Sequence, residues 1–305
     1  MIFDAETQTI VSNIGWVDKG TLWTFDLRGQ TEGHISVEGA QYLTLRAGSN
    51  GLFRLIHHQT ADQAVSIRRV ADPARELASV RYNKGQPVFQ GDLDLWKQVD
   101  PAIIIQTSWG PRLRLIDVAE RRLVDVDLTW FTNGNYDLGY QGLVDCMRMT
   151  ATGTIVVSVQ RSSKLVLIDP DNDKPIGAIE LADRGGNPVL RKRTGNDFLA
   201  SDYDTLCRVD SRSFEVSQSA VLQGAAAPNT RQFIGDYDIG AGTCAVARPF
   251  SGDVLLLDSE SFKVLGRAEV GGQPLAVCLI SESTVLTRDW KTGRVGTGRF
   301  DYRGI

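Results

Sequence analysis

A short apolar run that ends in aspartate recurs seven times along the chain. The intervals between successive aspartates are 41 to 52 residues, and the runs end at Asp26, Asp72, Asp117, Asp169, Asp210, Asp258 and Asp301. A repeat decides the architecture before any motif does, because each unit has to bury its apolar faces against its neighbours. The interval is that of a unit of four short strands rather than of a helical or leucine-rich repeat.

Within each repeat, apolar segments rich in Val, Ile, Leu and Thr are separated by turns rich in Gly, Ser, Asn and Asp. Short segments of this kind without a helical period indicate strands. Four strands account for the clearest repeat, at 142–181, which reads GLVDCMRM, TATG, TIVVSVQ, RSSK, LVLID, PDNDK and PIGAIEL. The sequence therefore predicts an all-β fold, a seven-bladed β-propeller of four-stranded antiparallel blades, in a single domain over 1–305.

Aspartate suits the turn between the third and fourth strands of a blade. Its carboxylate accepts hydrogen bonds from the next backbone N–H groups and so holds a tight hairpin. Continuous apolar runs, such as Ile103–Ile105 and Val156–Val157, fit strands that bury both faces between neighbouring blades.

The ends of the chain determine how such a ring closes. Met1 to about Asp4 remain for the first inner strand, and Tyr302 to Ile305 follow the last repeat aspartate, so the seventh blade lacks its fourth strand. A propeller ring normally closes by pairing its termini, which removes an open edge. We therefore expect a strand near the N-terminus to complete the seventh blade, with a six-bladed ring and extra strands as the alternative.

Three stretches, 152–181, 185–210 and 271–289, follow in whole or in part the order of a Gly-x-Pro opening, a second strand, a strand ending in Asp and a return strand. In this order the chain resembles seven-bladed propellers of the YVTN type, similar to the YncE-like proteins, over residues 40–301. The Tyr-Val-Thr-Asn tetrapeptide of that family is absent, and Val189 or Leu275 follows the proline where those proteins often place histidine. The resemblance implies a fold more than an activity.

In a propeller, the hairpins between second and third strands lie on the same rim as the loops between blades, and binding residues usually sit on such loops. Large aromatic and basic residues fill these hairpins here, although turns normally hold small polar residues. The candidate ligand-binding residues are Trp16, His57, Trp109, Tyr136, Tyr140, Arg161, Tyr203, Arg248, Arg288 and Trp290, with His58 and Phe250 beside them.

Two interpretations of these aromatic residues stay open. They wedge between adjacent blades, or they stay exposed and stack on a partner. An exposed aromatic and arginine rim suits a protein partner's hot spots, a sugar ring, or a small anion held by guanidinium groups. The long loop 129–142, which carries Tyr136, Asp137 and Tyr140, is either part of this site or a mere insertion.

Catalytic and metal-binding signals are weak. His57 and His58 are adjacent on a strand and so point to opposite faces, and no nucleophile elbow is present. The segment Asp169–Glu180 imitates the spacing of an EF-hand calcium loop, but Lys174 stands where that loop needs glycine, so we interpret it as a hairpin turn. Three further carboxylates are candidates for a divalent ion at the channel mouth, although their spacing does not demand one: Asp145, Asp202 and Asp289.

Glycine pairs and cysteines are interpreted structurally. The pairs Gly185-Gly186 and Gly271-Gly272 lie between strands with no helix after them, so we expect blade-to-blade turns rather than phosphate loops. The four cysteines lack zinc or redox spacing, and we expect buried free thiols, with a disulfide between strands that meet in space as the alternative: Cys146, Cys207, Cys244 and Cys278.

The net charge and the hydropathy pattern argue against some classes of partner. Lys and Arg number 33 against 37 Asp and Glu, and the net charge of -4 argues against nucleic acid and anionic membranes. No apolar run reaches 18 residues and the first 25 residues lack a secretory pattern, so we expect a cytoplasmic protein with no membrane insertion. We therefore predict a non-catalytic binding propeller, without cofactor, for a protein, glycan or small anionic ligand. The alternative is a lactonase- or lyase-type enzyme with its site at the channel mouth.

Overall fold

The computed structural model describes residues 1–13, 20–37, 43–47, 51–58, 63–82, 86–99, 102–106, 112–128, 143–159, 162–182, 186, 188–192, 197–222 and 233–302 of the 305-residue chain. The chain forms two compact units. The first consists of Met1–Asn83, Val88–Val99 and Gly224–Ile305, and the second of Lys84–Pro87 and Asp100–Gln223.

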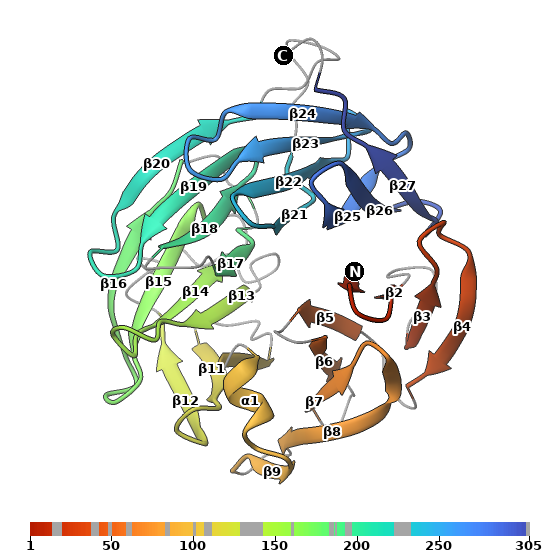
Figure 1. The fold of residues 1–305 in the computed structure, drawn as a ribbon. Coiled ribbons are helices and arrows are strands. Elements are labelled where there is room, and N and C mark those ends of the chain that lie inside the picture. Colours follow the sequence, from red (N-terminus) through yellow and green to blue (C-terminus); the bar gives the residue numbers. More distant parts are fainter. Residues whose placement is uncertain are drawn as a thin grey trace. The chain divides into compact units, whose positions relative to one another are not determined.

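The first unit contains four antiparallel sheets, each with strands in chain order (Figure 1). The first blade consists of β1 (Ile2–Asp4), β2 (Thr9–Asn13), β3 (Thr21–Phe25) and β4 (Thr31–Ser36), and the second of β5 (Leu43–Ala47), β6 (Leu52–His58), β7 (Gln63–Arg69), β8 (Asp72–Tyr82) and β9 (Val88–Gly91). The sixth blade consists of β21 (Asp236–Ile239), β22 (Thr243–Arg248), β23 (Asp253–Asp258) and β24 (Val264–Glu269). The seventh consists of β25 (Pro274–Ser281), β26 (Thr284–Asp289) and β27 (Val295–Arg299). A helix of four residues, α1 (Leu95–Gln98), follows β9.

The second unit contains three further antiparallel sheets. They are the third blade, β10 (Ala102–Gln106), β11 (Arg112–Asp117) and β12 (Arg122–Asp127); the fourth, β13 (Leu143–Arg148), β14 (Ile155–Val159), β15 (Lys164–Asp169) and β16 (Lys174–Glu180); and the fifth, β17 (Leu190–Lys192), β18 (Asp197–Asp202), β19 (Thr205–Asp210) and β20 (Val216–Val221).

The predicted fold class, an all-β seven-bladed β-propeller, is confirmed. Within the described ranges, four of the seven sheets have the predicted four strands, the third and seventh have three, and the second has five. The strands predicted for 142–181 are β13 to β16, and α1 is the one helix described. Each repeat in the sequence therefore corresponds to one antiparallel sheet.

The prediction that an N-terminal strand completes the seventh blade is wrong. Strand β1 pairs with β2 inside the first blade, with Ile2 opposite Val11. Both faces of β1 are used there, because Ile2 packs in a cluster with side chains of the second blade and Phe3 packs against a cluster that includes the seventh. The end of the chain turns instead to the sixth blade, where Asp301 and Arg267 exchange two backbone hydrogen bonds.

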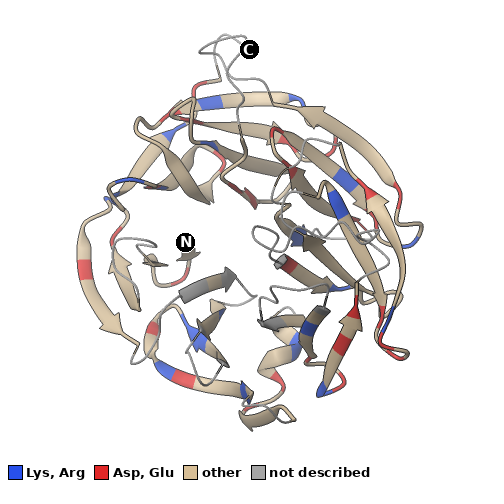
Figure 2. Cartoon of the chain, turned by 180° about the vertical axis from the view of Figure 1, so that it is seen from behind, with Lys and Arg blue, Asp and Glu red and all other residues tan. Residues whose placement is uncertain are grey.

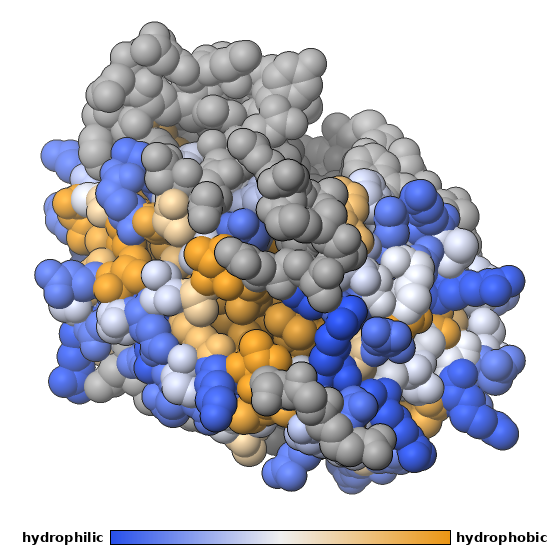
Figure 3. Space-filling model, turned by 90° about the horizontal axis from the view of Figure 1, so that it is seen from above, coloured by the Kyte–Doolittle hydropathy of each residue, from blue (hydrophilic) through white to orange (hydrophobic). Residues whose placement is uncertain are grey.

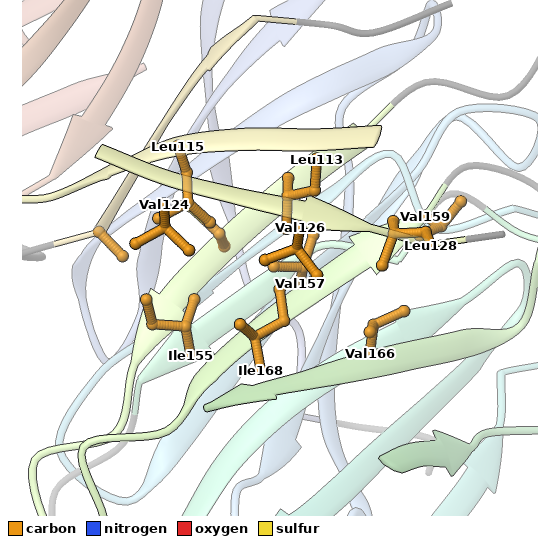
Figure 4. Packing of buried hydrophobic residues seen from close by; sticks show 12 residues of the cluster. Leu113, Leu115, Val124, Val126, Leu128, Ile155, Val157, Val159, Val166 and Ile168 are labelled. Carbon is orange, nitrogen blue, oxygen red and sulfur yellow. The ribbon is translucent and has the colours of Figure 1, made fainter. Parts of the chain in front are cut away.

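Strands in the middle of the sheets bury both faces, as the continuous apolar runs predict. On β14, Val157 points into a cluster shared with the third blade, whereas Val156 points into a cluster shared with the fifth. Both side chains are completely buried. Figure 4 shows the first of these clusters, in which β11 and β12 face β14 and β15. Each such side chain contributes about 1.5–3 kcal/mol by leaving water.

The repeat aspartates hold their turns as predicted at five of the seven positions. The Asp26 carboxylate accepts from the N–H groups of Arg28 and Gln30, both at 2.8 Å. At Asp210 the donors are the N–H groups of Arg212 and Ser213, at 2.9 and 2.7 Å. Comparable backbone hydrogen bonds form at Asp117, Asp169 and Asp258. Asp72 instead opens β8 opposite Arg69, and Asp301 makes the bridge to the sixth blade.

All four cysteines are buried free thiols, as predicted. Burial raises the pKa of the Cys207 thiol to about 12, and the nearby Asp202 carboxylate acts in the same direction. Burial also raises the pKa of Cys278 well above the ordinary thiol range. Both groups are therefore neutral parts of the core at physiological pH.

Candidate functional site

The sixth and seventh blades are neighbours in the first unit (Figure 1), and the second-to-third hairpin of each carries an aromatic residue. The β22–β23 hairpin carries Phe250, which is 46% exposed, and the β26–β27 hairpin carries Trp290, which is 41% exposed. Phe233, which precedes β21, packs edge-on against Phe250 with ring centroids 5.0 Å apart. We call the surface formed by Phe233, Phe250, Trp290 and the loop Gly271–Gln273 the aromatic edge.

The loop between β24 and β25 ties the two hairpins together through its backbone. On one side, Gly271 N donates to Gly252 O at 2.9 Å. On the other, Gln273 N donates to Asp289 Oδ2 at 2.6 Å, and Gln273 O accepts from Trp290 N at 2.8 Å. The two hairpins and the loop are thus connected by main-chain hydrogen bonds, which fix the places from which the aromatic rings project.

Glycine is required at the centre of this loop. Gly272 has a φ of +60°, and a Cβ there would lie 2.3 Å from Asp289 Oδ2. Gly186 has the corresponding place before the fifth blade, where a Cβ would lie 2.1 Å from Tyr203 N. Gly186, Gly271 and Gly272 lie between one blade and the next, as predicted for blade-to-blade turns, and Gly185 lies outside the described residues.

Asp289 is the acceptor that holds the Trp290 hairpin. Besides Gln273 N, its carboxylate accepts from the N–H and the hydroxyl of Thr292, at 2.7 and 2.8 Å. Burial by itself would raise the pKa of Asp289, but the hydrogen bonds from Gln273 and Thr292 outweigh it and the pKa lies below the ordinary value. Asp289 is therefore an ionised structural group at neutral pH.

Arg248, a predicted ligand-binding residue, is engaged inside the sixth blade. It is only 2% exposed, and its Nε and Nη2 donate to the two oxygens of Asp253 at 2.8 and 2.5 Å. Arg267 Nε also donates to Asp253, at 2.6 Å. Two cations on one buried carboxylate fix the base of the Phe250 hairpin.

Arg288, at the end of β26, reaches the first blade, where its Nη1 donates to the carbonyl oxygen of Asn13. Burial lowers the pKa of Arg288, while the Asp236 carboxylate opposes the shift, and the guanidinium stays charged. The structure thus brings Arg248, Arg288 and Trp290 onto two adjacent hairpins, of which Trp290 is the exposed member.

His57 and Tyr203 differ in their surroundings. His57 is 7% exposed, and its Nε2 lies 3.1 Å from Ser66 Oγ, which also accepts from Arg68 Nε at 3.0 Å. This histidine belongs to a buried polar cluster in the second blade. Tyr203, in the second unit, is partly exposed at the β18–β19 turn with a φ of +56°. The remaining predicted residues lie outside the described part of the chain: Trp16, Trp109, Tyr136, Asp137, Tyr140 and Arg161.

Two of the carboxylates that were candidates for a metal ion at the channel mouth accept hydrogen bonds from neighbouring segments. Asp145, on β13, accepts from Leu190 N of the next blade at 3.0 Å. Asp202 accepts from Gly186 N at 2.9 Å and from Ser163 Oγ at 3.1 Å. These groups join one blade to the next.

The acidic residues that are spaced like an EF-hand calcium loop each bind a different partner. Asp169 accepts from Asp171 N at 3.0 Å, Asp173 pairs with Arg122 at 2.7 Å, and Glu180 lies 2.5 Å from Lys164 Nζ. The segment is the β15–β16 hairpin, as predicted. Among the residues that the structure describes, no group of three or more His, Cys, Asp or Glu side chains is placed to hold a metal ion.

Basic, acidic and apolar residues are mixed on the surface. Basic and acidic residues are interspersed along the strands and turns (Figure 2). In the view from above, apolar side chains reach the surface between hydrophilic ones (Figure 3). The large apolar side chains exposed in the described ranges are Val88, Ile176, Val221, Phe250, Trp290 and Tyr302. No helix in those ranges is long and apolar enough to cross a membrane.

Sequence reasoning missed three parts of this surface. Phe233 precedes an inner strand, where the sequence offers no hairpin signal, and its role comes from the ring contact with Phe250. Lys291 and Arg294 are exposed on the Trp290 hairpin and were available in the sequence as basic neighbours of a turn tryptophan.

The fold is similar to solved propellers. The β-propeller domain of Cps50 (Swd1) from Myceliophteria thermophila is 12% identical with a TM-score of 0.64, over 98% of this chain and 94% of that one. The WD40 repeats of RRP9 are 10% identical with a TM-score of 0.63, over 98% and 93% of the two chains. U3-55K is 10% identical with a TM-score of 0.62, over 98% and 94%. At these identities the likeness concerns the fold alone. No family model matches the chain, and no curated protein matches its sequence.

Proposed function

We propose that this chain is a non-catalytic binding propeller that holds a protein partner on the aromatic edge. The observation that carries the proposal is the pair of exposed aromatic side chains, Phe250 and Trp290, on adjacent hairpins that backbone hydrogen bonds hold together. Aromatic residues on a rigid support are the typical hot spots of protein interfaces, because they bury a large area at little cost in conformational entropy.

The polar groups beneath the edge favour a protein over a glycan or a small anion. A small anion would need a guanidinium fork, but that of Arg248 is already occupied by Asp253. A sugar would need acceptors for its hydroxyl groups, but the Asp289 carboxylate already accepts from Gln273 and Thr292. The polar groups beneath the edge are thus engaged within the fold, and the edge offers its exposed aromatic rings together with the exposed cations of the Trp290 hairpin, a combination typical of protein interfaces.

The finer assignments stay predictions. These are the resemblance to the YVTN type, the cytoplasmic location, the absence of cofactor and nucleic acid, and contributions to the same site from Trp16, His57, Trp109, Tyr136, Tyr140, Arg161 and Tyr203.

A comparison of three immobilised proteins tests the proposal: the wild type, the double variant Phe250→Ala/Trp290→Ala, and the matched control Ile176→Ala/Val221→Ala, which removes two exposed apolar side chains from the second unit. Extract of the source cells is passed over each, and bound proteins are quantified by mass spectrometry. We expect a protein that the wild type and control retain and that the aromatic-edge variant binds about 30-fold less, from about 2 kcal/mol for a hot spot.

Equal retention by the aromatic-edge variant would contradict the proposal. So would a retained molecule that is a glycan or a small anion rather than a protein.

A further inference from the structure

The Trp290 hairpin carries two exposed cations beside its indole. Lys291 and Arg294 are both exposed, and among the described residues neither side chain has an ion pair or a hydrogen bond. Arg288, at the base of the hairpin, turns inward to Asn13 and interacts with the Asp236 carboxylate, so the exposed charges are those of Lys291 and Arg294. Asp289 is the one acidic residue between 288 and 294. The hairpin is therefore locally basic in a chain whose net charge is -4.

The backbone of this hairpin is fixed. Asp289 N donates to Arg294 O at 2.9 Å, and Gly293 N donates to Asp289 O at 3.0 Å, with Gly293 at a φ of +70°. Trp290 N is bound to Gln273 O in the neighbouring loop. An exposed indole and two cations thus project from a preorganised turn, which reduces the entropy lost on binding.

A carboxylate next to the aromatic edge limits the length of the complementary group. Glu269, whose side chain is 82% exposed at the end of β24, lies 3.6 Å from Arg267. A long polyanion that extended over this end of the sixth blade would meet a carboxylate. The two exposed cations of the Trp290 hairpin lie within four residues of one another, which fits a short acidic stretch.

We propose that the Trp290 hairpin binds a short acidic segment of the protein partner. Carboxylates of the segment pair with Lys291 and Arg294, and an apolar side chain next to them packs on the Trp290 indole. This inference rests on the proposed function and names the chemistry of the partner at the same site.

The experiment uses the full chain, immobilised and panned against displayed random 12-residue peptides. The most enriched peptide is then synthesised with a fluorescent label, and its Kd is measured for four proteins. These are the wild type, the charge-reversal variant Lys291→Glu/Arg294→Glu, Trp290→Ala, and a control, Lys263→Glu/Arg299→Glu, which makes the same change in charge at two other exposed positions of the first unit. Equal thermal midpoints for the four proteins establish that all are folded.

We expect the enriched peptides to contain an excess of Asp and Glu around an apolar residue. The charge-reversal variant should bind the peptide at least about tenfold more weakly, and the control should bind like the wild type. The Kd of the wild type should rise between 50 and 500 mM NaCl, because salt screens exposed ion pairs.

Two failures are distinguishable. Enriched peptides that are neutral or basic, with binding lost in Trp290→Ala, overturn the acidic segment and leave the proposed binding surface in place. The inference is also overturned if no peptide is enriched. If peptides bind but neither Trp290→Ala nor the charge reversal changes their Kd, the inference is overturned and the aromatic edge is not the binding surface.

Discussion

Single aspartates set the turns of this molecule, and their positions follow one local pattern. In four third-to-fourth hairpins the residue four places after the aspartate adopts a positive φ although it is not glycine: Arg121, Asp173, Phe214 and Phe262. A left-handed conformation costs such residues about 1–2 kcal/mol. The hydrogen bonds to the aspartate carboxylate help to offset that cost. The aspartates were predictable from the repeat, whereas the left-handed residues were not, because Arg and Phe carry no signal for a positive φ.

The turn at Asp210 predicts a dependence of stability on pH. Hydrogen bonds from the Ser213 and Arg212 N–H groups hold the pKa of Asp210 below its ordinary value. The folded state therefore binds fewer protons than the unfolded state, so the stabilisation is complete above the ordinary pKa near 3.8 and is lost as the pH falls through the lower, folded-state pKa. The free energy of unfolding, measured with urea, should differ most between wild type and Asp210→Asn at neutral pH.

Below pH 4 the difference should shrink. The control is Asp72→Asn, which makes the same change in charge at the start of β8. A difference between wild type and Asp210→Asn that stays constant from pH 7 to pH 2.5 would contradict the assigned role of the carboxylate.

Inner strands are joined from blade to blade by carboxylates in both units. In the second unit, Asp145 accepts from Cys146 N and from Leu190 N of the next blade. In the first unit, Asp238 accepts from Ile239 N and, at 2.8 Å, from Leu279 N of the next blade. Each carboxylate satisfies an N–H at the edge of an inner strand that the next blade leaves without a ladder partner. The strands were predictable from alternation and turns, but these links depend on neighbours distant in sequence.

Strand β27 provides a test of packing between the seventh and sixth blades. A Cβ at Gly298 would lie 2.6 Å from Val270 Cγ1, whereas a Cβ at Gly296, two residues earlier on the same strand, would meet nothing within 4 Å. We expect Gly298→Ala to reduce the free energy of unfolding by about 1–3 kcal/mol through overpacking. Gly296→Ala should leave it unchanged or raise it by about 0.4–1 kcal/mol through the unfolded state. Equal effects of the two substitutions in thermal or urea unfolding would refute this account of the packing.

At the scale of the whole molecule, the sequence predicted the architecture better than the site. Seven like repeats require like sheets, and this requirement is local in the sequence. Exposure is not local: Arg248 is buried because Asp253 lies opposite it on the next strand, and His57 because Ser66 and Arg68 surround it. Trp290 is exposed because backbone groups and the Asp289 carboxylate hold its hairpin, and the indole ring does not. Which hairpin residues face solvent therefore required the structure.

The single domain over 1–305 stays a prediction that calorimetry can test. One cooperative propeller should unfold in a single transition whose calorimetric and van't Hoff enthalpies agree. Two separate transitions, one for each compact unit, would show that the chain unfolds as two domains.

Hydrogen exchange of the chain, alone and with the protein that the aromatic edge retains, measures the binding surface most directly. We expect slower exchange on binding at the backbone amides of 248–252, 271–273 and 289–294, which form the two hairpins and their connecting loop. Protection confined to other segments, such as β9 and α1, with unchanged exchange in these three, would contradict the claim that the partner binds at the aromatic edge.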